Sequence, residues 1–389
     1  MAFDNDRSGK KSRQIILIIV LLCGFSFVLW YNFFGRGSGL SDNDPYPADD
    51  VVPEGTCYHY QQLKDNEKKI YRSLYKACKN CEAEIPIKPI DTNDFDNVIY
   101  AFRHDHPEFF WLHGTSVKMT EIDGSVIRVS FDLPSDVSEK MAKLEKKAEE
   151  ILKNAPQLAY DKVKYFYEYI INKTEYDLTA PDNQNAYSAL VNGKSVCGGY
   201  ANAFLYLCDK AGVYCGNVSG DVTGRDLHAW NFVKIYGQFY WVDVTWGDPT
   251  YLGGSSGKDN LNYDYLCVTD DDILKNRTIT YPTSGAFTYP KCTDNSLNYY
   301  VKKGCYFESY DKSQVYNYIL TEIGFSHTKK VDLKFASEKA FNEAVTDIFE
   351  SDEYLNSLGK DLEKRFGVSI SNMSGTSSGS SCHIVLEFV

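Results

Sequence analysis

Residues 185–249 constrain the fold more than any other part of the chain, because they predict one helix followed by a tight hairpin. Apolar side chains first recur at the i, i+3, i+4 and i+7 spacing of a helix with one buried face: Ala201, Phe204, Leu205 and Cys208. This spacing predicts a helix that begins within two residues of Cys197, with Ser195 as its candidate N-cap.

Cys197 stands at the predicted start of this helix. A thiol in that position faces backbone N–H groups that have no partner within the helix, as well as the positive end of the helix dipole. Both favour the thiolate, which is the nucleophilic form of cysteine. Gly198 and Gly199 follow, and their lack of side chains is expected to leave room beside the sulfur for a carbonyl substrate. The pattern therefore favours a reactive cysteine over a small residue of the core.

Two segments of alternating polarity follow the helix and predict a β-hairpin that carries a histidine and an aspartate. The first segment begins at His228, the second contains Asp243, and residues 236–237 form the turn between them. In that register His228 opposes Thr245 and lies on the same face as Asp243, close enough for the two side chains to meet. A slip of one residue would place them on opposite faces of the hairpin.

Cys197, His228 and Asp243 together supply the groups that nucleophilic catalysis needs. The histidine activates the thiol, and the aspartate fixes the tautomer and orientation of the histidine. Each residue also has an ordinary structural interpretation, as a core thiol, a strand histidine and a turn or surface acid. Their combination, on a glycine-flanked helix start and one face of a hairpin, favours the catalytic interpretation.

At these residues the sequence resembles the transglutaminase-like superfamily, in particular its bacterial transglutaminase/protease-like branch. The resemblance rests on three motifs in order: NAYSALVNGK, VCGGYANAFLYLCDKAG and HAWNFVKIYGQFYWVDVTWGDP. It implies an α+β fold with a papain-like core, in which the nucleophile helix packs on an antiparallel sheet. It also implies a role for each of the three residues, with Cys197 as nucleophile, His228 as general base and acid, and Asp243 as the residue that orients the histidine.

The chemistry that the resemblance implies is acyl transfer through a thioester. The Cys197 thiolate would attack a glutamine carboxamide or a peptide carbonyl, and the oxyanion would be held by the backbone N–H of Cys197 and a second donor, for which Tyr187 or a tryptophan is a candidate. Water as the acceptor gives a peptidase or amidase, and an amine gives a protein crosslink. Hydrolysis is favoured because water is abundant unless the site excludes it. No cofactor or metal is expected.

The alternative is a catalytically silent binding module, in which the same fold presents a groove to a partner at the cell surface. Such a module would be expected to lose one of the three residues, and all three are present. The expected partner is a protein or peptide, with the cell envelope as its candidate source. The formal net charge of −12 argues against general nucleic-acid binding, which needs a basic face. The sequence does not indicate an oligomeric state.

The N-terminus predicts a membrane anchor. No charged residue lies between Ile15 and Phe34, and a helix of that length spans roughly 30 Å, the thickness of the hydrocarbon core of a bilayer. Basic residues precede this segment and acidic residues dominate after it. The positive-inside rule then predicts a single-pass protein with a cytoplasmic tail at 1–14, an anchor at 15–34 and an extracytoplasmic catalytic domain. A cleaved signal peptide and a buried core helix are the alternatives, although the segment is long for a signal peptide and lacks a clear cleavage site.

Composition and periodicity divide the rest of the chain into four parts. Residues 35–54 predict a polar linker, 55–135 an N-terminal accessory domain, 136–289 the transglutaminase-like catalytic domain and 290–389 a C-terminal α+β accessory domain. Both accessory domains are expected to be small and to mix helices with strands.

Within these parts the spacing of apolar residues predicts individual elements. Helical spacing predicts helices at residues 65–78, 95–102, 136–153, 160–174, 337–349 and 355–366. Alternation predicts strands at 83–90, 125–133, 262–268, 331–335 and 383–389, and Ser374–Ser381 is expected to be a loop. Prolines restrict the strand at 83–90 to a sheet edge.

Residues that could bind metals or form disulfides elsewhere give weaker signals. The chain has eleven cysteines, whose pairing the sequence does not reveal. Cys78 and Cys81 are expected to be structural thiols or to form one disulfide, because no second Cys/His pair with zinc spacing accompanies them. His104 and His106 are expected to be capping or surface residues. The acidic run at 270–272 is expected to begin a helix rather than to form a calcium loop.

Overall fold

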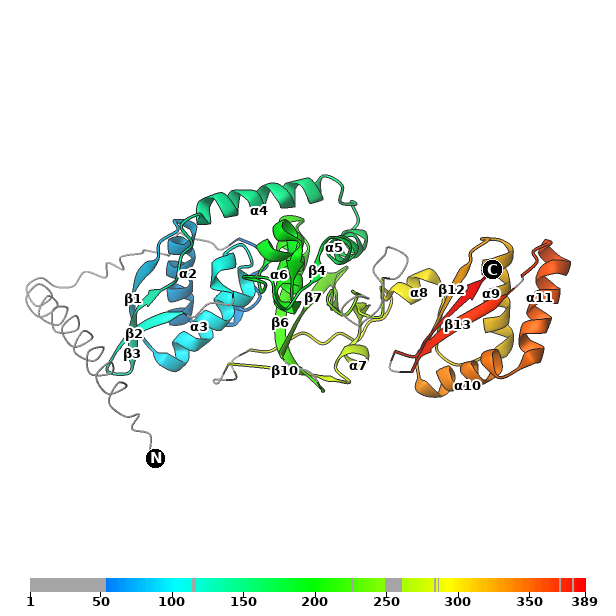
Figure 1. Ribbon diagram of the computed structural model, residues 1–389. Coiled ribbons are helices and arrows are strands. Elements are labelled where there is room, and N and C mark those ends of the chain that lie inside the picture. The colour runs from blue at the N-terminus through cyan, green and yellow to red at the C-terminus, as the bar shows by residue number, and fades with distance from the viewer. Residues whose placement is uncertain are drawn as a thin grey trace, which may run out of the picture. The chain divides into compact units, whose positions relative to one another are not determined.

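The computed structural model describes residues 54–389, apart from 114–116, 225–226, 249–260, 283–284, 286, 371 and 380 (Figure 1). The predicted cytoplasmic tail and anchor, and all but the last residue of the predicted linker, lie outside the described residues. Within the part that is described, no helix is both long enough and apolar enough to cross a membrane.

A five-stranded antiparallel sheet lies beside one central helix in the segment that carries the candidate site (Figure 1). Helix α6 (Cys197–Lys210) packs against strands β6 and β7 of this sheet. The side-chain amide of Asn231 in β7 donates to the carbonyl of Ala201 in α6 at 3.1 Å, which ties the helix to the sheet. The strand order is β10 (Arg277–Ile279), β6 (Tyr214–Val222), β7 (Leu227–Ile235), β8 (Gln238–Val242) and β9 (Leu266–Val268).

Aromatic side chains form the core on one face of this sheet. Trp230 and Phe232 of β7 are buried there beside Trp241 of β8. Alternate residues of a strand point to the same face, so His228 belongs to the same row as Trp230 and Phe232. Its ring is accordingly stacked near that of Trp230, with the centroids 6.0 Å apart. The packing of the tryptophans thus fixes the face on which the histidine lies.

Two helices and a short parallel ladder precede α6. The helices are α4 (Val137–Leu152) and α5 (Ala159–Lys173), which pack against α6 in agreement with the predicted helices at 136–153 and 160–174. A π-helical turn (Ser188–Asn192) and the pairing of β4 (Glu175–Tyr176) with β5 (Lys194–Ser195) then lead the chain to Cys197. The chain therefore enters α6 from a paired strand.

The N-terminal described segment combines helices with a three-stranded sheet. Its elements are a 3-10 turn (Tyr60–Gln62), α2 (Asp65–Lys79), β1 (Glu84–Asp91), α3 (Thr92–Asp105), a second 3-10 turn (Phe110–Leu112), β2 (Lys118–Ile122) and β3 (Ser125–Ser130). The strand order β1-β3-β2 places the proline-containing β1 at an edge, as predicted. Helix α3 also contacts β6, which brings this segment to the candidate site.

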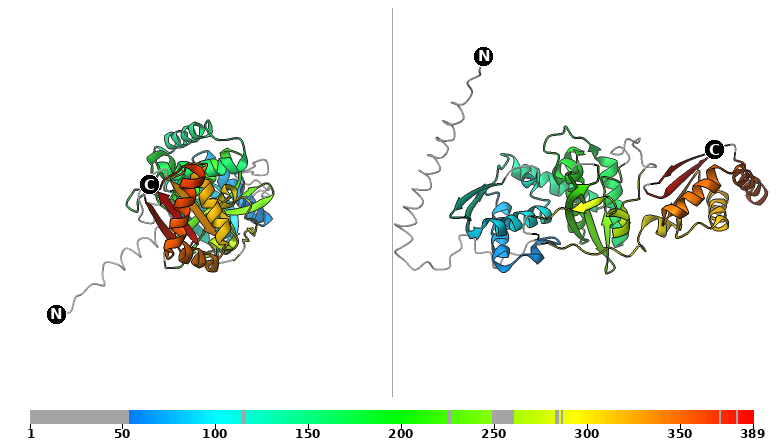
Figure 2. Two further views of the ribbon diagram at one scale, coloured as in Figure 1. Left: turned by 90° about the vertical axis from the view of Figure 1, so that its right-hand side faces the viewer. Right: turned by 90° about the horizontal axis from the view of Figure 1, so that it is seen from below.

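The C-terminal segment combines three helices and a four-stranded sheet around a core of its own (Figure 2). The sheet order is β11 (Tyr306–Phe307), β12 (Lys330–Phe335), β14 (His383–Phe388) and β13 (Met373–Ser378), and the helices are α9 (Lys312–Gly324), α10 (Glu338–Phe349) and α11 (Asp352–Phe366). Two short helices, α7 (Asp270–Ile273) and α8 (Tyr299–Lys303), lie between β9 and β11 in the chain. Thr269 and Asp272 form a capping box at α7, so the acidic run begins a helix as predicted.

The predicted loop at Ser374–Ser381 is wrong, because most of it belongs to strand β13. Met373–Ser378 pairs antiparallel with β14 along its whole length. Most side chains of β13 are exposed. Its strand structure therefore rests on backbone pairing rather than on the apolar alternation that a sequence pattern detects. The predicted strand at 262–268 is also shorter than expected, since only Leu266–Val268 is paired.

Candidate active site

Cys197 is the first residue of α6, within the predicted interval for the helix start. Its side chain is half-buried, and its Sγ lies 4.0 Å from the carbonyl oxygen of Leu227. The predicted cap is wrong, because Val196 is the N-cap and makes no side-chain capping bond. Ser195 instead donates to the carbonyl of Asn183 at 2.7 Å. The first-turn N–H groups of α6 therefore receive no side-chain cap.

The β7–β8 hairpin has the predicted register, with Ile235 paired with Gln238. The ladder ends at the pair of Asn231 and Val242, so Thr245 is not paired with His228, although the register continued beyond the ladder would pair them. His228 and Asp243 nevertheless share a face, as predicted, and Nε2 of the histidine lies 2.8 Å from Oδ2 of the aspartate. Their side chains are 3% and 0% exposed, so the pair is buried.

The thiol extends this pair to a line of three side chains. Asp243 occupies Nε2 of His228, and Cys197 lies beside the histidine, lines the same cleft and helps to raise the histidine's pKa. Nδ1 is therefore the ring nitrogen that remains available to the sulfur. In this order a proton can pass between thiol and imidazole while the carboxylate holds the ring.

Charge determines the protonation of the buried pair. Burial by itself would lower the pKa of His228, but the charge of Asp243, its hydrogen bond and the neighbouring Cys197 raise that pKa to about 9. Burial would likewise raise the pKa of Asp243, but the charges of His228 and then of Arg277 lower it to about 2. At neutral pH the histidine is an imidazolium and the aspartate a carboxylate. An imidazolium beside a cysteine favours the thiolate.

Arg277 belongs to the site although no sequence pattern pointed to it. Its Nη2 donates to Oδ2 of Asp243 at 2.7 Å, and both side chains are buried. Its guanidinium also lies over the ring of Trp246, 4.4 Å from the centroid, and near Tyr265. The positive charges of Arg277 and His228 thus compensate the buried carboxylate of Asp243, as a buried charge requires.

The two glycines after the cysteine serve packing rather than access. A Cβ on Gly199 would lie 1.8 Å from Oγ of Ser195 and 2.9 Å from the carbonyl oxygen of Asn185. A Cβ on Gly198 would lie 2.3 Å from Oε1 of Gln184. The space that was expected to admit a substrate is therefore filled by the preceding turn at one glycine and by a carboxamide at the other.

Gln184 lies near the thiol, whereas the sequence named Tyr187 or a tryptophan as candidates for the second oxyanion donor. Gln184 lines the same cleft as Cys197, and its backbone carbonyl accepts a hydrogen bond from the amide of Asn202 at 3.0 Å. Tyr187 packs elsewhere, with its ring centroid 5.3 Å from that of Phe110. The sequence signal that could have found Gln184 was its place directly before the NAYSALVNGK motif.

Cys197 and His228 open onto a cleft of about 520 Å³, a volume typical of small-ligand sites. Part of its wall comes from the sheet, for example from Asn217 of β6. Another part comes from the end of α3, where Arg103 lines the cleft. A segment that the sequence placed in an accessory domain therefore contributes to the wall of the candidate active site.

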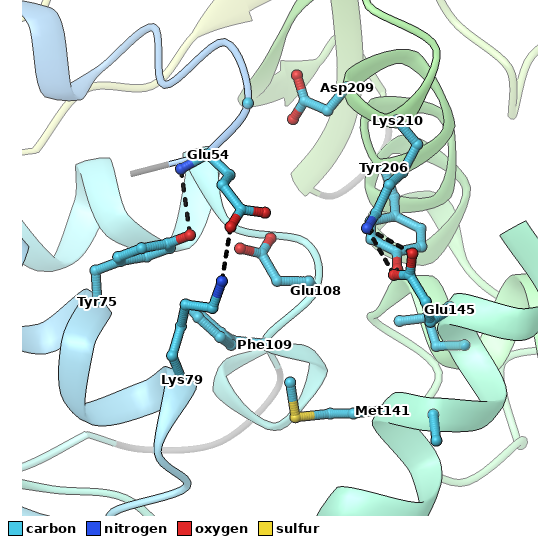
Figure 3. Close-up of a pocket in the computed structure, with 13 residues that line it drawn as sticks. Glu54, Tyr75, Lys79, Glu108, Phe109, Met141, Glu145, Tyr206, Asp209 and Lys210 are labelled. Atoms are coloured by element: carbon cyan, nitrogen blue, oxygen red, sulfur yellow. Dashed lines mark hydrogen bonds and ion pairs between the residues drawn. The ribbon is translucent and has the colours of Figure 1, made fainter. Parts of the chain in front are cut away.

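A second cavity, of about 370 Å³, holds several charged side chains near the other end of α6 (Figure 3). Burial raises the pKa of Asp209, which lines this cavity, to about 7. Along the axis of α6, Asp209 lies about 18 Å from Cys197, so this cavity is separate from the candidate active site. Two ion pairs line it: Lys79 with Glu54 at 2.7 Å, and Lys210 with Glu145 at 2.6 Å.

His104 is half-buried, whereas His106 is buried and caps α3 at its C-terminus, so of the two roles expected from the sequence, capping or surface, capping holds for His106. Nε2 of His104 accepts a hydrogen bond from the hydroxyl of Ser219 at 2.9 Å. His106 is fully buried and lies 2.9 Å from the hydroxyl of Tyr71, although it also ends α3 as the C-cap. Among the described residues, no group of three or more His, Cys, Asp or Glu side chains is arranged to hold a metal ion.

All ten cysteines in the described part of the chain are free thiols. Eight of them are buried, whereas Cys81 and Cys197 are partly exposed. Cys78 and Cys81 are therefore two separate thiols in this structure. A reagent that modifies exposed thiols is thus expected to meet Cys197 and Cys81 first.

Residues 145–245 match the family model of the transglutaminase-like superfamily. This chain contains a transglutaminase-like domain. The domain has mixed α/β content, and the matched range includes Cys197, His228 and Asp243 but ends before Arg277. The fold class inferred from the sequence is therefore correct at this level.

Two curated relatives match over the transglutaminase-like domain. The Kyphoscoliosis peptidases of Homo sapiens and Mus musculus are each 31% identical to the chain over 103 residues. The match covers 22% of this chain and 16% of each relative, so it spans only a small part of their length. A crystal structure of a TGase superposes with a TM-score of 0.24 at 16% identity, over 42% of this chain and 50% of that one.

Proposed function

We propose that this protein is a cysteine acyl-transfer enzyme in which Cys197, His228 and Asp243 act as a catalytic triad. The observation that carries the proposal is the buried, hydrogen-bonded pair of His228 and Asp243 beside the Cys197 thiol, with Cys197 and His228 lining one cleft. A core histidine would be satisfied on both sides by buried groups. Here the histidine lies beside the partly exposed sulfur of Cys197, which is the environment expected of a nucleophile.

In the first half-reaction the Cys197 thiolate attacks the carbonyl carbon of a peptide bond or a glutamine carboxamide. A sulfur–carbon bond forms, and the carbonyl π electrons move to the oxygen, which becomes an oxyanion. The imidazolium of His228 then gives its proton to the leaving nitrogen as the carbon–nitrogen bond breaks. An amine or ammonia leaves, and a thioester on Cys197 remains beside a neutral histidine.

In the second half-reaction His228 acts as a general base. It takes a proton from water or from an acceptor amine, whose oxygen or nitrogen attacks the thioester carbonyl. The carbon–sulfur bond breaks, the Cys197 thiolate returns and His228 is again an imidazolium. Asp243 stays a carboxylate throughout and stabilises the imidazolium, while Arg277 holds Asp243 in place.

We assign the two donors of the oxyanion hole to the backbone N–H of Cys197 and the side-chain amide of Gln184. The first lies at the N-terminus of α6, where N–H groups have no partner within the helix. The second donor belongs to the Gln184 carboxamide, which packs over Gly198, the residue that follows Cys197. Loss of one donor of this kind lowers kcat by about 10²–10³-fold, so Gln184→Ala should fall in that range.

Hydrolysis is the reaction that we favour. The thiol is partly exposed, so water would reach the thioester unless a bound acceptor displaced it. The relatives that match over this domain are named peptidases, which supports the same choice. Protein crosslinking is the second outcome, and a silent binding module is disfavoured because it has no need of a partly exposed thiol beside a buried histidine–aspartate pair.

The apolar segment at residues 15–34 supports a further part of the proposal, that a single helix anchors the enzyme in a membrane with its catalytic domain outside the cell. Protease treatment of intact cells should then digest the catalytic domain. Its complete protection in intact cells, with digestion only after lysis, would contradict this orientation.

The reaction is tested by product analysis. The full chain in mild detergent is incubated with a glutamine-rich protein and a labelled primary amine, with Cys197→Ala as the matched control, and the products are analysed by mass spectrometry. New chain ends identify a peptidase, conversion of glutamine to glutamate a deamidase, and incorporation of the label a crosslinker. If the wild type and Cys197→Ala are indistinguishable in all three, the proposal is wrong for such substrates and the binding module is favoured.

A further inference from the structure

A short turn of the chain, residues 262–265, lies between the candidate active site and the C-terminal segment. This turn leads into β9, whose Leu266 pairs with Val242, the residue before Asp243. At the end of the turn, the carbonyl of Tyr265 accepts a hydrogen bond from the backbone N–H of Asp243 at 2.9 Å. The position of the turn therefore bears directly on the carboxylate residue of the proposed triad.

Neighbouring elements hold the first half of this turn. The hydroxyl of Tyr167 in α5 donates to the carbonyl of Asn262 at 2.5 Å, and the N–H of Asn262 donates to the carbonyl of Gly247 at 3.0 Å. Tyr263 stacks on Tyr299 of α8, with the ring centroids 3.8 Å apart and 9° between the ring planes. The first two residues of the turn thus have fixed partners on both sides.

A buried ion pair with the C-terminal sheet holds the second half of the turn. Nζ of Lys334 in β12 lies 2.7 Å from Oδ1 of Asp264, and the two side chains are only 9% and 6% exposed. Nζ also donates to the carbonyl of Ser381. His383 of β14 lies near the other carboxylate oxygen, with its Nδ1 3.8 Å from Oδ2. Burial by itself would raise the pKa of Asp264, but the charges of Lys334 and then of His383 lower it. Asp264 is therefore a buried carboxylate, and the C-terminal sheet supplies its cations.

Stability alone does not explain a lysine in this place. Lysine is rarely buried unless it is paired, and a buried ion pair often contributes no more to stability than a well-packed apolar pair would. The pair does fix a position, because Nζ and Oδ1 must stay in contact if each charge is to remain compensated. Lys334 thereby holds Asp264 against β12, one residue before the carbonyl that binds the N–H of Asp243.

We propose that Lys334 is a positioning residue for the triad, because through Asp264 it fixes the carbonyl of Tyr265 and with it the backbone of Asp243. The C-terminal segment then completes the active site rather than only adjoining it. As this role requires, that segment and the transglutaminase-like domain belong to one compact unit. The inference rests on the proposed function, since it concerns the same carboxylate. Lys334 takes no part in bond formation or proton transfer.

Loss of the lysine should affect the thiol in three steps. In Lys334→Met the carboxylate of Asp264 stays buried without its nearer cation, so the turn is expected to shift. The hydrogen bond from the N–H of Asp243 then weakens, and the carboxylate of Asp243 moves relative to the imidazole of His228. An imidazolium that is less well stabilised favours the thiolate of Cys197 less.

Hydrogen exchange tests the first two steps without any chemistry at the thiol. The full chain in mild detergent is transferred to deuterated water, and peptides that cover residues 240–247 are followed by mass spectrometry. We expect Lys334→Met to speed the exchange of the Asp243 amide about tenfold, and Lys334→Arg, which keeps the charge, to retain most of the protection. Lys339→Met is the matched control, because its pair with Glu343 is 85% and 49% exposed and its exchange should equal that of the wild type.

Alkylation by iodoacetamide, in which the thiolate sulfur bonds to the methylene carbon and iodide leaves, tests the effect on the thiol. The rate constant of Cys197 is measured from about pH 5 to about pH 9, with Cys81 as the reference thiol in the same sample. We expect Lys334→Met to move the rise of the Cys197 profile to higher pH and to lower the rate at pH 6 by about threefold to tenfold. Lys334→Arg should restore most of both. Lower global stability alone would leave this pH profile in place.

A double variant keeps the inference falsifiable if Lys334→Met fails to fold. Lys334→Met combined with Asp264→Leu removes both buried charges, so no unpaired charge remains, and we expect the same faster exchange and the same shifted profile. Unchanged exchange at the Asp243 amide in either variant, or an unchanged alkylation profile despite faster exchange, would overturn the inference and leave the proposed function standing. If Cys197 of the wild type reacts no faster than Cys81, the proposed function fails, and exchange at Asp243 still decides whether the C-terminal sheet holds the turn.

Discussion

Replacement of Arg277 by glutamine should destabilise the fold through its buried ion pair with Asp243. The two side chains are 1% and 0% exposed, and Nη2 lies 2.7 Å from Oδ2. Removal of one partner of such a pair costs about 3–5 kcal/mol, because the other charge stays buried. Asp243 keeps a second cationic partner in His228, 2.8 Å away, so we expect a loss of about 3 kcal/mol, the lower end of that range.

The same substitution should change the titration of the site. Arg277 helps to lower the pKa of Asp243, and without it the carboxylate acts on His228 alone. The pKa of His228, which is about 9 in the wild type, should therefore rise further. The imidazolium would then persist to higher pH in the variant, which a pH titration of the histidine ring by NMR would detect.

Urea unfolding of four chains measures the coupling directly. The chains are the wild type, Arg277→Gln, Asp243→Asn and the double variant, which form a double-mutant cycle. We expect a coupling free energy of at least about 2 kcal/mol. Arg365→Gln is the control, because its pair with Asp361 is 54% and 32% exposed and should contribute less than about 1 kcal/mol. Single losses that add within about 0.5 kcal/mol would refute the reasoning.

Three further predictions concern packing and pH. Gly199→Ala should destabilise the fold by about 1–3 kcal/mol, because its Cβ would lie 1.8 Å from a serine oxygen. Gly359→Ala is the control: this residue of α11 has open space where a Cβ would be placed, so the substitution should be neutral or stabilising. Thermal unfolding compares the two variants. Asp209→Asn should stabilise the protein above pH 7 but not near pH 4. Folding raises the pKa of Asp209 from its ordinary value of 3.8 to about 7, so the wild type loses stability as the pH rises between these two values. Equal stability of the variant and the wild type at pH 8 would contradict this prediction. The stability that His228 contributes when protonated should be fully present below its ordinary pKa of 6.5 and should be lost as the pH rises through about 9. The free energies of unfolding of the wild type and of His228→Gln, measured over this pH range, should therefore converge at its alkaline end.

Short-range patterns were sufficient to predict the part of the site that lies within one stretch of chain. The start of α6 at Cys197 follows from the helical spacing of apolar residues. The register that joins His228 to Asp243 follows from a two-residue turn and from alternation, which together leave one pairing that buries the right face. Both patterns extend over only a few neighbouring residues, so they can be recognised in a single sequence.

Residues that reach the site through tertiary packing gave no such signal. Arg277 meets Asp243 because β10 pairs with β6, where Arg277 lies opposite Val222, far from the motif in the chain. Arg103 reaches the cleft because α3 packs against β6. No periodicity spans these separations. The packing role of Gly199 was hidden for the same reason, since the side chains that surround it come from the preceding turn.

The measurement that tests the central claim most directly is the alkylation rate of Cys197 by iodoacetamide near pH 6, in the wild type and in His228→Ala. An ordinary thiol with a pKa of about 8.5 is less than about 1% thiolate at that pH, whereas a thiol paired with an imidazolium is largely thiolate. We predict that Cys197 reacts at least about tenfold faster than Cys81 in the wild type, and that His228→Ala removes this advantage. A Cys197 that reacts no faster than Cys81 at pH 6, or equally fast with and without His228, would contradict the account of this protein as a cysteine acyl-transfer enzyme.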